Sequence, residues 1–175
     1  MKVYAGFRER VGAFVLDYVI ILFYLVAVTL IFLLLNSLFN LNDRLFMDRV
    51  RAQLTAFLLI TLPVALYFAI SESSNRQATW GKQRMKLRVT DGNGERISFW
   101  RALARTFLKF IPWELSHTLI WALSFSPQAD AILIYYGFGF VYLLVGLNIA
   151  SLLLTKTHQT IYDLLTKTYV VKQAL

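Results

Sequence analysis

The chain has 175 residues, of which 58% are hydrophobic and only 16% are charged, and its formal net charge is +8 at pH 7. Soluble domains average roughly 45–50% apolar and about 25% charged residues, so this composition predicts a membrane protein and argues against a water-soluble domain. The chain contains no cysteine, which excludes disulfides, cysteine-based metal sites and thiol nucleophiles.

The first predicted membrane span covers about 11–35 and follows a short basic segment. An apolar run of this length is enough to cross a hydrocarbon core about 30 Å thick as a helix. Its only charged residue is Asp17, and a carboxylate inside a span is costly unless it has a partner or a function. Arg10 precedes Asp17 by two helical turns, so both should lie near one face. We therefore expect Arg10 and Asp17 to form an ion pair.

The second predicted span covers about 52–71 and contains Pro63 in its interior. In a membrane helix a proline kinks the helix without ending it, because a neighbouring helix can satisfy the carbonyl that loses its donor. The preceding loop, 36–51, is nearly neutral, whereas basic residues outnumber acidic ones in 72–109. Because cytoplasmic loops carry an excess of Lys and Arg, segment 72–109 is expected in the cytoplasm.

Segment 85–111 predicts a cytoplasmic β-hairpin followed by an interfacial helix. Apolar and polar residues alternate before the turn residues at 91–94, and the return strand is expected at 96–99. Over 99–111 apolar and basic residues occupy opposite faces, which is typical of a helix that lies in the membrane interface. The basic face supplies three candidates for binding anionic lipid headgroups, Arg101, Arg105 and Lys109.

Two further spans are expected at about 107–126 and 131–154, joined by a turn at 126–130, and Pro112 should bend the interfacial helix into the bilayer. Two crossings are needed in this part if the N-terminus, segment 72–109 and the tail are all cytoplasmic. The predicted fold is therefore a single all-α membrane domain over 1–175. It has four transmembrane helices, a cytoplasmic β-hairpin and an interfacial amphipathic helix, with both termini in the cytoplasm.

Three stretches share a pattern with a known family. They are RVGAFVLD at 10–17, TWGK at 79–82 with the segment up to Arg105 after it, and HQTIYDLLTKTYVV at 158–171. In this order and spacing they resemble the RDD family of bacterial membrane proteins, which is named for an arginine and two aspartates. The chain departs from the family where it has Trp80 for proline, Tyr162 for histidine and Lys167 for glycine. The resemblance implies a bacterial inner-membrane protein, in a family some of whose members look like cation/proton antiporters.

Asp17, Arg10 and Asp163 are the candidates for ion or proton exchange. Asp17 with Arg10 is either a buried pair that fixes helix packing or a site that exchanges a proton or monovalent cation. Asp163 follows the last span, and two interpretations stay open for it as well. It either joins Asp17 around a shared cytoplasmic cavity or pairs with a basic residue among Lys82, Arg84 and Arg101.

Three further residues are candidates for a polar relay. Glu114 and His117 are three residues apart on one predicted helix, so they share a face, and His158 follows the last span. The structural interpretation is that Glu114 and His117 satisfy local hydrogen bonds near Pro112. The alternative is that they form a relay inside the bundle.

The motifs of common enzymes are absent from the sequence. It has no serine-histidine-aspartate order, zinc-ligand spacing or nucleotide fingerprint, so we expect a protein that is not an enzyme and that holds no metal or cofactor. One hypothesis is a transporter for a cation, proton or small solute, which would be a homo-oligomer because four helices enclose little volume. The alternative is a non-catalytic scaffold or accessory subunit that binds anionic lipid or a cytoplasmic partner. We attribute the positive charge to cytoplasmic loops rather than to binding of nucleic acid.

Overall fold

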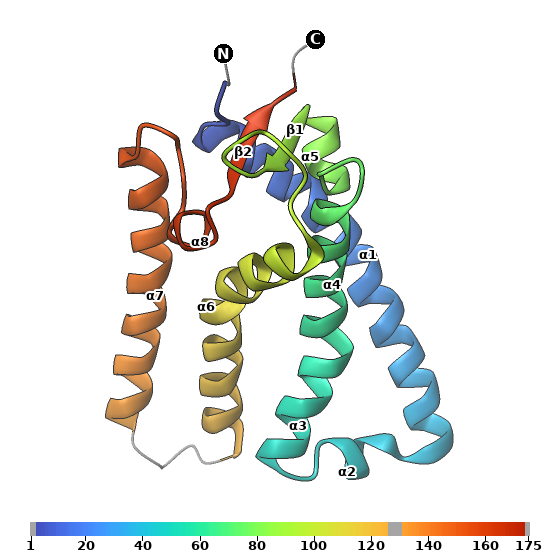
Figure 1. The fold of residues 1–175 in the computed structure, drawn as a ribbon. Helices are drawn as coiled ribbons and strands as arrows, with labels where there is room; N and C mark the ends of the chain where they lie inside the picture. Colours follow the sequence, from blue (N-terminus) through green and yellow to red (C-terminus); the bar gives the residue numbers. More distant parts are fainter. Residues whose placement is uncertain (1–2, 126–130, 174–175) are drawn as a thin grey trace.

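The computed structural model describes residues 3–125 and 131–173, most of which are helical (Figure 1). The expected turn at 126–130 lies outside the described residues. The elements, in chain order, are α1 (Phe7–Phe39), α2 (Leu41–Leu45), α3 (Arg49–Ala56), the π-helix η1 (Phe57–Thr61), α4 (Leu62–Ser73), α5 (Trp80–Arg84), β1 (Leu87–Thr90), α6 (Phe99–Phe125), α7 (Ala131–Leu154), α8 (Ile161–Leu165) and β2 (Tyr169–Lys172).

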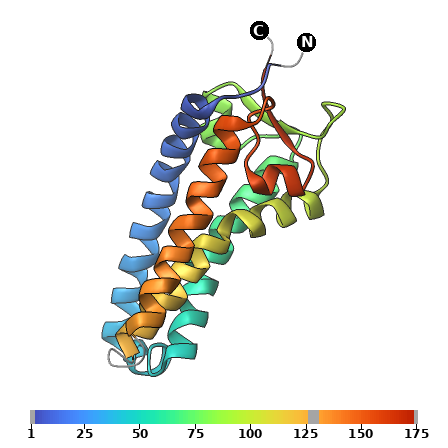
Figure 2. The same cartoon turned by 90° about the vertical axis from the view of Figure 1, so that its left-hand side faces the viewer.

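The described residues contain three helical stretches that are long and apolar enough to cross a membrane, namely Phe7–Phe39, Arg49–Ser73 and Ile132–Leu154. They coincide with the expected first, second and last spans. Their large apolar side chains are mostly exposed at the surface of the protein, which suits contact with lipid rather than water. Figure 2 shows these helices running along one long axis, with the sheet, α5 and α8 gathered at one end. That end is called the sheet end below.

Pro63 lies in the first turn of α4, directly after the π-helix η1. Its nitrogen carries no hydrogen, so the carbonyl of Leu59, four residues earlier, loses its usual helical donor. The hydroxyl of Tyr24 on α1 donates to the Leu59 carbonyl at 2.6 Å. The expectation that a neighbouring helix would satisfy the freed carbonyl is confirmed.

Helix α6 is continuous from Phe99 to Phe125, with Pro112 inside it. Figure 1 shows its first half crossing the molecule below the sheet and its second half turning to run alongside α7. The expected interfacial helix and third span are therefore two halves of one bent helix. The second half is not among the three stretches named above, so its crossing of the membrane stays a prediction.

The expected β-hairpin is wrong in its second strand. β1 pairs antiparallel with β2 from the tail, with Leu87 opposite Lys172 and Thr90 opposite Tyr169. The turn at 91–94 does form, but after it the chain adds only an isolated bridge between Arg96 and Thr90. The physical reason is burial. The tail offers Val170, which packs against Leu87 and Val89 in the core, whereas the polar segment after the turn offers only Ile97.

Both ends of the described chain meet at this sheet. The backbone nitrogen of Ala5 donates to the Val170 carbonyl at 2.9 Å, and that of Lys172 donates to the Val3 carbonyl at 2.8 Å. The start of α1 is therefore held next to the tail.

Helix α5 approaches α1 most closely at Gly81. A Cβ atom built on Gly81 would lie 2.1 Å from the carbonyl oxygen of Ala13 and 2.8 Å from Cγ of Asp17. The first of these atoms belongs to the backbone, so no side-chain rotation can relieve the clash. Only glycine allows the two helices to pack at this distance.

Replacing Gly81 with alanine is therefore expected to destabilise the protein by about 1–3 kcal/mol, because α1 and α5 must separate. Thermal unfolding of the detergent-solubilised protein measures the effect. Gly139→Ala on α7 is the matched control, since a Cβ there would meet nothing within 4 Å. Equal unfolding temperatures for the two variants would show that the close packing of α5 on α1 is wrong.

Candidate functional site

Five charged side chains from five elements form a buried ion network at the sheet end. Arg10 contacts Asp163 at 2.6 Å, and Asp163 also contacts Arg105 at 2.7 Å. Arg105 contacts Glu72 at 2.5 Å, and Glu72 contacts Lys82 at 2.7 Å. Cations and anions thus alternate along a chain that links α1, α8, α6, α4 and α5. Each buried carboxylate has two cationic partners, which offset much of the cost of removing it from water.

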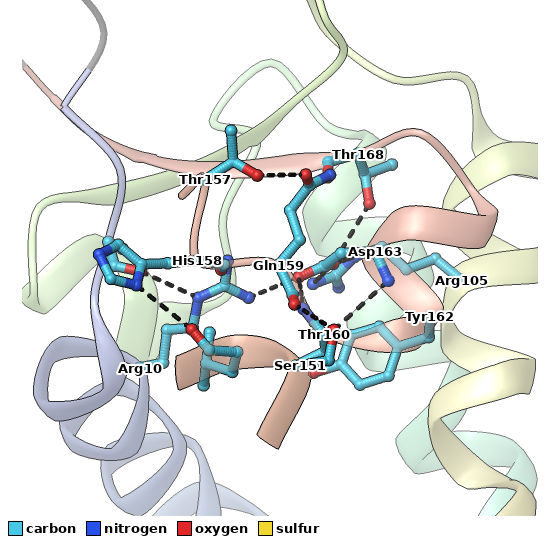
Figure 3. Close-up of polar contacts among 12 residues, drawn as sticks. Arg10, Arg105, Ser151, Thr157, His158, Gln159, Thr160, Tyr162, Asp163 and Thr168 are labelled. Atoms are coloured by element: carbon cyan, nitrogen blue, oxygen red, sulfur yellow. Dashed lines mark hydrogen bonds and ion pairs between the residues drawn. The ribbon is translucent and has the colours of Figure 1, made fainter. Parts of the chain in front are cut away.

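Asp163 lies between Arg10 and Arg105 in this network (Figure 3). It also accepts hydrogen bonds from the Thr168 hydroxyl at 3.2 Å and from the backbone of Thr160 at 3.4 Å, the latter as part of a capping box that begins α8. Burial alone would raise the pKa of Asp163, but the guanidiniums of Arg105 and Arg10 hold that pKa below its usual range. Asp163 is therefore an ionised structural anchor at neutral pH.

Arg10 and Asp17 do not form the expected ion pair. The Arg10 guanidinium donates to Asp163 and to the carbonyls of His158 at 2.5 Å and Ala5 at 3.2 Å. Two helical turns separate Arg10 from Asp17 by about 10 Å along the axis, whereas the C-terminal segment brings acceptors directly to the guanidinium. The partners expected for Asp163 among Lys82, Arg84 and Arg101 were also wrong, because Arg10 and Arg105 take their place.

Asp17 is satisfied by uncharged donors. It is 1% exposed and accepts hydrogen bonds from the Tyr67 hydroxyl at 2.8 Å, the Thr79 hydroxyl at 2.6 Å and the Gly81 backbone at 2.7 Å. Three donors of this kind stabilise a buried carboxylate without a counter-ion. Since they come from α4 and from the beginning of α5, Asp17 fixes both elements against α1.

The three basic residues of α6 do not form one exposed stripe, so that expectation is wrong. Arg101 is exposed, Arg105 belongs to the ion network, and Lys109 turns inward, with its ammonium 3.3 Å from the centre of the Phe68 ring. The apolar face is turned outward instead, and Phe107 is 69% exposed. Of the three basic residues, only Arg105 thus pairs with buried carboxylates within the described structure, and these come from distant parts of the sequence.

Of the predicted polar relay residues, Glu114 and His117 lie close together but His158 lies elsewhere. Glu114 and His117 lie on the second half of α6, where the Thr61 hydroxyl donates to Glu114 and the ring of His117 lies 3.9 Å from the same carboxylate. His158 lies at the sheet end and contacts Arg10 and the Leu152 carbonyl. Over residues 3–125 and 131–173, no hydrogen bond or ion pair joins His158 to Glu114 or His117.

A cavity of about 70 Å³ lies beside Asp17. It has room for a few water molecules and a polar lining that suits them. Four cationic side chains contribute to that lining and Asp17 is its only acidic residue; the cations are Arg10, Lys82, Arg105 and Lys109. This small space is called the cationic cavity below.

Lys109 differs from the other three cations of the cationic cavity. Arg10, Lys82 and Arg105 are paired with carboxylates of the ion network. Within the described part of the chain, Lys109 makes no ion pair or hydrogen bond, and its ammonium lies over the rings of Phe68 and Phe110. Glu72 and Asp17 attract this ammonium from beyond ion-pair distance. The four cations around the cavity outnumber the carboxylates Asp17, Glu72 and Asp163 by one, so the site has an excess positive charge that suits an anion. No group of three metal-ligating side chains is present among the described residues.

Sequence reasoning missed Glu72 and Tyr67. Glu72 is the only charged residue between 52 and 73, and an acidic residue at the end of an apolar helix is a signal that could have identified it. Tyr67 carries no comparable signal, because an uncharged tyrosine is ordinary in an apolar helix and other tyrosines lie in the first and last spans.

The fold and site define a helical membrane-type protein whose apolar helices are tied together at one end by buried charges. The sequence model of the RDD family matches residues 4–167, nearly the whole chain. The protein belongs to the RDD family. Comparisons with curated proteins and with solved structures found no match.

Replacing Arg105 with methionine is expected to destabilise the protein by about 3–5 kcal/mol, because Glu72 and Asp163 each lose a cation inside the protein. Arg101→Met is the matched control, one turn earlier on the same helix but exposed, and should change stability by no more than about 0.5 kcal/mol. Chemical or thermal unfolding in detergent gives both values. Similar small effects for the two variants would contradict the ion network.

Proposed function

We propose that the chain is a non-enzymatic protein of the bacterial inner membrane with four spans and both termini in the cytoplasm. The second half of α6 is the remaining span, third in chain order. Two observations support this orientation. The basic segment 72–109 and both ends of the described chain lie at the sheet end, whereas α2, in the nearly neutral loop, lies at the opposite end (Figure 1). The sheet end then faces the cytoplasm, as the excess of Lys and Arg favours.

Within this orientation, the proposed function is to bind an anion, as a small solute or as a headgroup, in the cationic cavity. The observation that supports this most directly is the Lys109 ammonium, which lines the cavity and makes no ion pair among the described residues. At short range in a partly desolvated site, one unit charge is worth several kcal/mol to a ligand of opposite sign.

Exchange of a cation or proton at Asp17 has less support. A metal cation or proton approaching Asp17 through the cavity would pass four positively charged side chains, and the carboxylate already accepts three hydrogen bonds. Electrostatic repulsion makes that route unfavourable. If the bound anion is transported, additional copies of the chain would have to complete a path, because the cationic cavity is small.

Inorganic phosphate at millimolar concentration is therefore expected to raise the unfolding temperature of the detergent-solubilised protein by a few degrees, compared with chloride at equal ionic strength. Lys109→Gln should remove this shift. Arg101→Gln, which removes an exposed cation from the same helix, should retain it. Absence of the shift in the unmodified protein, or an equal shift in Lys109→Gln, would refute anion binding at the cavity.

A further inference from the structure

An apolar groove of about 540 Å³ opens beside the cationic cavity, between α1, α6 and α7. This volume lies within the range of about 300–1,000 Å³ that is usual for small-molecule pockets. Its α7 wall includes Val145 and Ile149, which are 42% and 41% exposed, so the groove is open along that helix. A lipid could therefore enter it sideways from the bilayer.

The groove has one polar end. Arg10 and Lys109 line both the groove and the cationic cavity, as do Phe14 and Tyr162. These residues belong to the sheet end, whereas the α7 residues that line the groove extend away from it, from Leu152 to Val141. The groove and the cationic cavity thus share lining residues. Arg10 and Lys109 lie where the apolar groove meets the polar cavity.

The length of the groove matches one leaflet of a membrane. Leu152 and Val141 are eleven residues apart on α7, which corresponds to about 16 Å along the helix axis. Half of a hydrocarbon core about 30 Å thick is about 15 Å. An acyl chain that lies along α7 from Leu152 to Val141 would therefore cross about one leaflet and reach the middle of the bilayer.

We propose that this groove holds one anionic phospholipid of the cytoplasmic leaflet, with an acyl chain along α7 and its phosphate at Lys109 and Arg10. The proposal rests on the proposed anion binding at the cationic cavity and names its ligand. Charge complementarity selects the headgroup, because Lys109 makes no ion pair among the described residues and Arg10 adds a guanidinium beside its ammonium. Basic pockets between membrane helices on the cytoplasmic side are known to take anionic headgroups in this way.

The surface of α7 provides matched variants for the test. Val145→Trp and Ile149→Trp each fill the groove without touching the cations. Leu133→Trp is the control, because Leu133 is 66% exposed on the same helix and does not line the groove. Two groove-filling variants are used so that a folding defect in one does not decide the result, and thermal unfolding checks each.

The experiment is native mass spectrometry of the full chain after exchange into an equimolar mixture of phosphatidylglycerol and phosphatidylcholine. The unmodified protein and Leu133→Trp should retain one phosphatidylglycerol, favoured at least about tenfold over phosphatidylcholine. Val145→Trp and Ile149→Trp should lose it but keep the stabilisation by phosphate. Lys109→Gln should lose both the preference for phosphatidylglycerol and the stabilisation by phosphate.

Equal retention of the two lipids by the unmodified protein would overturn the lipid proposal. Unchanged retention of phosphatidylglycerol in both Val145→Trp and Ile149→Trp would also overturn it. If phosphate still stabilised the protein, anion binding at the cationic cavity would stand and its ligand would be a soluble anion. The unmodified protein could instead be a lipid-free dimer that Val145→Trp and Ile149→Trp convert to monomers. The groove would then be an interface between copies, and the lipid proposal would fail.

Discussion

The contacts of Asp163 with Arg10 and Arg105 connect the beginning of the chain to its end. A carboxylate with no exposed surface is tolerated only because two guanidiniums neutralise it, and Arg105 in turn neutralises Glu72. Removing Asp163 would leave Arg10 without an ion-pair partner among the described residues, and removing Glu72 would do the same to Lys82. The apolar helices face lipid and have little hydrophobic reason to associate with one another, so these polar contacts determine how they meet at the sheet end.

The same network determines the charge of the candidate site. Asp163 and Glu72 form ion pairs with Arg10, Arg105 and Lys82. Asp17 instead accepts hydrogen bonds from neutral donors. Lys109 is left as the cation without an ion pair in the described structure. The sequence pattern predicted a site that offers an acidic residue to a cation, whereas we propose a site that offers a lysine to an anion. The apolar groove beside it is the basis for proposing that this anion is a lipid headgroup.

The sequence predicted features that depend on local chemistry. Apolar length located three spans, and the missing donor of Pro63 predicted a compensating contact from a neighbouring helix. Features that depend on distant residues were missed. Arg10 and Asp163 are 153 positions apart, and the partner strand of β1 comes from the tail. The α6 pattern separated basic from apolar positions, but nothing local shows that Arg105 pairs with the buried Glu72 and Asp163.

The central claim is that Arg10 and Asp163 interact directly inside the protein, and a double-mutant cycle tests it most directly. Unfolding free energies would be measured in detergent for the unmodified chain, Arg10→Gln, Asp163→Asn and the double variant. Because the two groups meet at 2.6 Å with little exposure, we predict a coupling free energy of about 1–3 kcal/mol. Additive effects, with a coupling free energy near zero, would contradict the account.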